Sequence, residues 1–117
     1  MIQVQVKRTH ERELQTVTIT GHAEAGPYGY DLICAGVSAV TFGAVNAVEE
    51  LCGVALDIEQ SEDGGYLSCS IPESIQNNSR EQVTLLLEGM LSSLRTIEAS
   101  YSEHIQVNDR QGGGKRA

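Results

Sequence analysis

The repeat of apolar residues along the chain switches between two periods, and this switching constrains the fold more than any other feature. Residues 2–8 and 14–20 alternate apolar and polar side chains, which is the period of a strand with one buried face. From Val37 to Leu51, apolar residues recur every three or four positions and form one stripe along a helix. The same patterns then return in the order strand, strand, helix, strand, at residues 54–58, 67–71, 83–101 and 105–107.

These segments predict an α+β fold with the element order ββαββαβ. Turn-forming residues separate them at Thr9–Glu13 and Glu62–Gly65, and Gly53 marks the end of the first helix. Ser79 followed by Gln82 is the pattern of a capping box and predicts the start of the second helix. Because every strand has one apolar and one polar face, only one side of the sheet should be covered. We therefore expect a two-layer sandwich, with two helices on one face of a mostly antiparallel sheet.

The length of 117 residues suits one domain with one modest core. All patterned segments lie within residues 1–109, which we predict to form that domain. Residues 110–117 offer no apolar surface to bury, and we expect this tail to be disordered.

The charge balance limits the classes of partner. Eight basic and sixteen acidic side chains give a formal net charge of −8. A groove for nucleic acid gains its affinity from Lys and Arg, so direct nucleic-acid binding is disfavoured. An acidic surface suits a basic partner, and it also serves solubility alone, so both interpretations stay open.

Cysteine usage and hydropathy indicate the compartment. Cys34, Cys52 and Cys69 are an odd number of cysteines with no CxxC pair, which predicts neither a disulfide framework nor a zinc ribbon. A reducing cytoplasm fits this pattern best. The longest apolar runs in the sequence are too short to cross a bilayer, so we expect no membrane partner.

The segment from Thr20 to Ser38 carries the strongest sign of chemistry. His22 ends a predicted strand, and Cys34 lies in the first turn of the helix that follows. If Asp31 is the N-cap, Cys34 is the third helical residue, next to free backbone N–H groups and the positive end of the helix dipole. Both this dipole and an imidazolium favour a thiolate, which is the nucleophilic form of cysteine. His22 would then act as base and acid for Cys34, and the same amides could hold an oxyanion.

Simpler interpretations of these residues are also open. Most cysteines in small domains are inert core residues, and Cys52 and Cys69 lie on apolar stripes of that kind. A histidine beside a glycine is often a surface or capping residue. The simpler interpretation of Asp31 is a helix cap without a catalytic role. The simpler interpretation of Ser38, one turn after Cys34, is a role in packing.

Other cysteine chemistries fit the sequence less well. A phosphatase loop needs an arginine six positions after the nucleophile, and this chain has Val40 there. His10 and His104 lie in hydrophilic segments without ligand-like spacing, so we expect neither a metal nor another cofactor.

The same segment resembles the signature of a known family. Gly21-His22-Ala23, a glycine-bearing loop, Gly29-x-Asp31-x-x-Cys34-Ala35 and Val37-Ser38 are similar to the pattern of the ribosomal-processing cysteine protease family, Prp. The pattern spans about eighteen residues, and the element order agrees with the family to about Asp109.

The resemblance implies a homodimeric cytoplasmic endopeptidase that removes a short N-terminal extension from a basic protein of the large ribosomal subunit. It implies a catalytic dyad of Cys34 and His22, with Asp31 and Ser38 in support. The family's mobile loop matches Ala23–Tyr30, where Gly26, Pro27 and Gly29, together with Gly21 before it, would gate substrate entry. The alternatives are a non-enzymatic acidic module that binds a basic ribosomal protein or assists assembly, and a weaker thiol-based redox or acyl-transfer protein.

Overall fold

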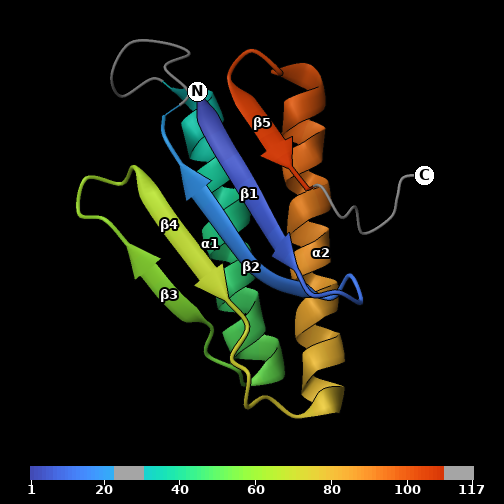
Figure 1. The fold of residues 1–117 in the computed structure, drawn as a ribbon. Helices are drawn as coiled ribbons and strands as arrows, with labels where there is room; N and C mark the ends of the chain where they lie inside the picture. The colour runs from blue at the N-terminus through green and yellow to red at the C-terminus, as the bar shows by residue number, and fades with distance from the viewer. Residues whose placement is uncertain (23–30, 110–117) are drawn as a thin grey trace.

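The structure, a computed structural model, describes residues 1–22 and 31–109. Its elements are β1 (Ile2–Arg8), β2 (Leu14–Thr20), α1 (Leu32–Cys52), β3 (Asp57–Gln60), β4 (Tyr66–Ser70), α2 (Asn77–Ser100) and β5 (Ile105–Asn108). The five strands form one sheet in the order β3-β4-β2-β1-β5. The pair β1–β5 is parallel and the other neighbours are antiparallel. Both helices pack on the same face of this sheet (Figure 1), which confirms the predicted two-layer α+β fold and the order ββαββαβ.

The core lies between the sheet and the two helices. Alternate residues of β1, β2 and β4 point into it, and Val4, Val17 and Cys69 are at most 2 % exposed. The helices contribute residues at spacings of three and four. The buried helical residues are Ile33, Val37, Thr41, Val48, Val83, Leu87, Met90, Leu91 and Leu94.

The other face of the sheet carries paired hydroxyl groups. Thr16 and Ser70 are register partners, and their side-chain oxygens are 3.0 Å apart. Thr18 donates to Ser68 from the next position on the same face, at 3.4 Å. These cross-strand pairs use the polar half of the alternation that the sequence shows.

Two predicted boundaries were wrong. The third strand is Asp57–Gln60, with every residue exposed, and not residues 54–58. Because β3 is an edge strand, its side chains contribute little to the core, and Leu56 enters the core from the segment before it. The second helix begins at Asn77 with Gln76 as an extended N-cap, whose carbonyl accepts from the Arg80 amide at 2.8 Å. Ser79 therefore lies inside the first turn, and the capping box is absent.

Helix α1 begins and ends as expected, but its exposed surface carries more apolar side chains than the predicted single buried stripe allows. Asp31 is its N-cap, and Gly53 follows its last residue in the left-handed conformation, with φ of 68°. Leu51, which we placed on the buried stripe, is 73 % exposed. Helix α1 has 21 residues, and the mean hydropathy over its most apolar 18 residues is 1.6. It is therefore long and apolar enough to cross a membrane, and the expectation about short apolar runs was wrong. Length and composition alone are weak evidence, because core helices of soluble proteins pass the same test.

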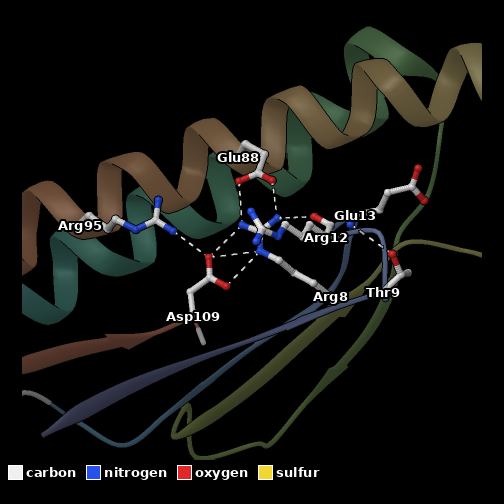
Figure 2. Close-up of polar contacts among 7 residues, drawn as sticks. All are labelled: Arg8, Thr9, Arg12, Glu13, Glu88, Arg95 and Asp109. Atoms are coloured by element: carbon white, nitrogen blue, oxygen red, sulfur yellow. Dashed lines mark hydrogen bonds and ion pairs between the residues drawn. The ribbon is translucent and has the colours of Figure 1, made fainter. Parts of the chain in front are cut away.

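A buried cluster of charged side chains lies at the end of the sheet where β1 and β5 end (Figure 2). The Arg8 side chain is fully buried and pairs with Glu88 of α2 and with Asp109 after β5. This cluster joins the first strand to the end of the described chain. The predicted disorder of residues 110–117 concerns a segment outside the described residues.

Candidate active site

A cleft of about 230 Å³ opens between the first half of α1 and one end of the sheet. Residues from five elements and two turns surround it. They are Ile2, Ile19, Gly21, His22, Cys34, Val37, Ser38, Thr41, Phe42, Gln60, Gly64, Tyr66 and Leu67. His22 and Cys34, twelve residues apart in sequence, thus line one hollow.

Cys34 occupies this cleft because of the way α1 begins. Leu32 is the first helical residue and Asp31 the N-cap, which confirms the predicted position of Cys34 as the third residue. The backbone N–H of Cys34 donates to Oδ1 of Asp31 over 3.1 Å. Cys34 is half-buried, is not in a disulfide and packs against the core. Its thiol is therefore next to the helix N-terminus, where the dipole favours negative charge.

The N-cap hydrogen bond restricts one role that the sequence predicts for this turn. That role is to hold an oxyanion with the backbone amides of the turn. The amide of Cys34 itself already donates to the Asp31 carboxylate. An oxyanion contact from this N–H would have to compete with the cap.

His22 is placed by a tight backbone turn after β2. Gly21 has φ of +89°, and a Cβ there would collide with the carbonyl oxygen of Met1. Glycine is thus required at position 21 by conformation and by space. The Gly21 amide donates to the Gly65 carbonyl over 2.9 Å, which ties the end of β2 to the turn before β4. His22 itself is exposed and forms part of the cleft wall.

Asp31 and Ser38, the two residues predicted to support the dyad, occupy different places. Ser38 lies one turn after Cys34 on α1, is exposed and lines the cleft. Asp31 does not line the cleft and contacts Cys34 through the backbone. Gly26, Pro27 and Gly29, and the whole predicted gating loop Ala23–Tyr30, lie outside the described residues.

Sequence reasoning missed part of the cleft wall. Gln60 and Tyr66 come from β3 and β4, and no motif in the sequence marks them. Thr41 of α1, a residue of the core, also lines the cleft. Its position seven residues after Cys34 was a usable signal, since residues two turns apart share one helix face.

The other two cysteines are removed from this chemistry. Cys69 is 2 % exposed in the core, and burial raises the pKa of its thiol to about 11. Cys52 ends α1, half-buried, at the opposite end of the helix from Cys34. Among the described residues, Cys34 is the one cysteine that lines the cleft.

A thiol at a helix N-terminus and an imidazole on the wall of the same cleft define a cysteine hydrolase as the class of protein that this site fits. The model of the family "Cysteine protease Prp" matches residues 1–106. The chain belongs to this family of cysteine proteases, and it is a hydrolase of that type. The predicted family resemblance is thereby confirmed, and the protease is favoured over the binding module and the redox protein.

Relatives and solved structures agree with the assignment. The ribosomal processing cysteine protease Prp of Bacillus subtilis is 45 % identical over 107 residues, covering 92 % of this chain and 96 % of that protein. The protein of the same name from Staphylococcus aureus (strain Mu50) is 40 % identical over 108 residues, covering 92 % and 98 %. A crystal structure of the essential ribosomal processing protease Prp from S. aureus, with a covalently linked product peptide, has a TM-score of 0.82. It is 38 % identical, and the match covers 92 % of this chain and 98 % of that one.

Proposed function

We propose that this protein is an endopeptidase that removes the N-terminal extension of a large-subunit ribosomal protein, using Cys34 and His22 as a catalytic dyad. The observation that carries the proposal is the presence of both side chains on one cleft in a chain of the cysteine protease family. The relatives named for ribosomal processing, and an S. aureus structure with a substrate peptide, support the choice of substrate class.

The chemistry follows from the two side chains. His22 takes the proton from the Cys34 thiol, and Sγ attacks the carbonyl carbon of the scissile peptide bond. The tetrahedral intermediate collapses to a thioester when the C–N bond breaks, and His22 gives its proton to the leaving amine. A water molecule, deprotonated by His22, then attacks the thioester and releases the new carboxyl end and the thiol.

Two neighbours support this dyad. Asp31 caps α1 and fixes the backbone of Cys34 through its 3.1 Å contact. Ser38 lies on the cleft wall one turn later and supports the substrate or the nucleophile from that side. The charge of −8 favours the encounter with a basic ribosomal protein in the cytoplasm.

The test mixes the purified protein with the long form of a ribosomal protein that carries an N-terminal extension. Mass spectrometry should show loss of one N-terminal peptide. The Cys34→Ala and His22→Ala proteins should not release it, whereas Cys52→Ala, remote from the cleft, should retain activity. Cleavage by His22→Ala at the wild-type rate would refute the dyad.

We further propose that the protein works as a homodimer. Support comes from the family resemblance, which implies a homodimer, and from two large apolar side chains that α1 leaves exposed, Leu32 at 82 % and Phe42 at 42 %. Light scattering should give twice the mass of the chain at micromolar concentration, and a monomer mass would contradict the proposal.

A further inference from the structure

The turn between β3 and β4, residues 61–65, lies against the imidazole of His22. A Cβ built on Gly65 would be 3.1 Å from Nε2 and 3.8 Å from Cε1 of His22. The same point is 3.5 Å from Oδ1 of Asp63. The imidazole and the carboxylate therefore both border the space above Gly65, which only the absence of a side chain keeps open.

Hydrogen bonds hold the Asp63 carboxylate in this turn. Its Oδ1 accepts from the Ser61 hydroxyl at 2.6 Å and from the Gly65 amide at 2.9 Å. These two contacts, the hydroxyl first, lower the pKa of Asp63, and the charge of His22 adds to the effect. Asp63 is therefore ionised at neutral pH although it is exposed.

The same turn also fixes the backbone that carries His22. The Gly65 carbonyl accepts from the Gly21 amide at 2.9 Å, next to the last β2–β4 register pair, Thr20 and Tyr66. The turn thus sets the direction in which the chain leaves β2 and limits where the imidazole lies. One turn, about forty residues away in sequence, therefore bonds to the backbone before His22 and lies beside its imidazole.

We propose that the β3–β4 turn is the positioning element of His22, with Gly65 as the surface on which the imidazole rests and Asp63 as the carboxylate beside the imidazolium formed when His22 takes the thiol proton. This inference rests on the proposed role of His22 as the base of the dyad. Asp63 and Gly65 are positioning residues, because they act through His22 and do not line the cleft themselves. Tyr66 of β4 and Cys34 of α1 are the other titratable side chains on the described cleft wall.

Gly65→Ala tests the contact. Gly65 does not have a positive φ, so alanine adds a methyl group at the imidazole without backbone strain. The imidazole must move by a few tenths of an ångström to accept this methyl group. Because a displacement of about 1 Å costs on the order of 100-fold in rate, we expect kcat to fall about fourfold with KM within about twofold. Gly89→Ala is the matched control, because a Cβ there meets nothing within 4 Å.

Asp63→Asn tests the charge. Asparagine keeps the acceptor for Ser61 and Gly65 and removes the carboxylate. We expect kcat to fall about threefold, because an exposed charge near the imidazole has only a small effect. Glu62→Gln removes the same charge from the neighbouring exposed residue and should leave kcat unchanged.

A second measurement does not depend on cleavage. The chemical shifts of the ring protons of the three histidines, measured by nuclear magnetic resonance, report on the surroundings of the His22 imidazole. Gly65→Ala and Asp63→Asn should shift the His22 signals and leave those of His10 and His104 in place. Unchanged His22 signals and unchanged kcat in both variants would overturn the inference. If the signals move but the wild-type protein cleaves no ribosomal protein, the positioning by the turn stands and the proposed function fails.

Discussion

The Arg8 guanidinium donates two parallel hydrogen bonds to the Asp109 carboxylate, from Nε to Oδ1 over 3.0 Å and from Nη2 to Oδ2 over 2.9 Å (Figure 2). The remaining donors reach Glu88 and the carbonyl of Arg12. These contacts, with Glu88 first, raise the pKa of Arg8 further above its ordinary range, so the cation persists at every accessible pH. The buried cluster joins β1, α2 and the end of β5.

We expect Arg8→Ala to lower the free energy of unfolding by about 3–5 kcal/mol, because it removes the fully buried guanidinium that pairs with both the buried Asp109 and the partly buried Glu88. Arg95→Ala is the control, since Arg95 contacts the same Asp109 but is 41 % exposed. Its cost should stay below about 1 kcal/mol. Urea denaturation of both variants checks the difference, and equal costs would contradict this account of the cluster.

The cap of α1 gives a second prediction. Asparagine caps a helix about as well as aspartate, so Asp31→Asn should keep both stability and cleavage near wild type. Asp31→Ala loses the contact to the Cys34 amide and should cost about 1 kcal/mol. Thermal unfolding and cleavage rates measure both effects. A large loss of kcat in Asp31→Asn with unchanged stability would show that the carboxylate charge takes part in catalysis.

Thr41 has a buried hydroxyl with no hydrogen-bond partner in the part of the chain that the structure describes. An unpaired buried hydroxyl costs about 1–3 kcal/mol, and valine has the same shape without it. We expect Thr41→Val to raise the free energy of unfolding by about 1 kcal/mol. Thr16→Val, which removes a hydroxyl paired with Ser70, should bring no such gain. A destabilised Thr41→Val protein would mean that the hydroxyl is satisfied in solution.

The buried Cys69 thiol predicts alkaline sensitivity. Its pKa is raised by burial from 9.0 to about 11, so the folded state holds this proton more tightly than the unfolded state. The resulting stability is fully present below pH 9 and is lost as pH rises toward 11. At most, the loss is about 2.7 kcal/mol. Denaturation at several pH values should show a steeper alkaline decline for wild type than for Cys69→Ala. Parallel declines would refute the assignment.

Salt should slow cleavage at low substrate concentration. The proposed substrate is basic and the protein carries a net charge of −8, so their encounter is favoured by long-range attraction. Screening sets in over about 8 Å near physiological ionic strength. We expect kcat/KM to fall as sodium chloride rises, with kcat nearly constant. If kcat/KM does not depend on salt, the negative charge does not help substrate encounter and serves solubility alone.

The sequence by itself determined the elements and the start of the site. Alternation in Ile2, Val4 and Val17 gave the strands because side chains of a strand alternate between two faces. The cap at Asp31 and the position of Cys34 followed from local rules, because an N-cap contact spans only three residues. Local patterns failed at Ser79 and at residues 54–58, where pairing and packing with distant segments set the boundaries.

Only the tertiary structure decided what surrounds His22. The strand order β3-β4-β2-β1-β5 puts the β3–β4 turn beside the end of β2, and no local pattern specifies that order. Gly65 and Asp63 read as ordinary turn residues in the sequence, since glycine and aspartate favour turns for reasons of their own. Both residues lie near the imidazole because the sheet brings two distant segments together, and such proximity depends on the packing of the whole fold.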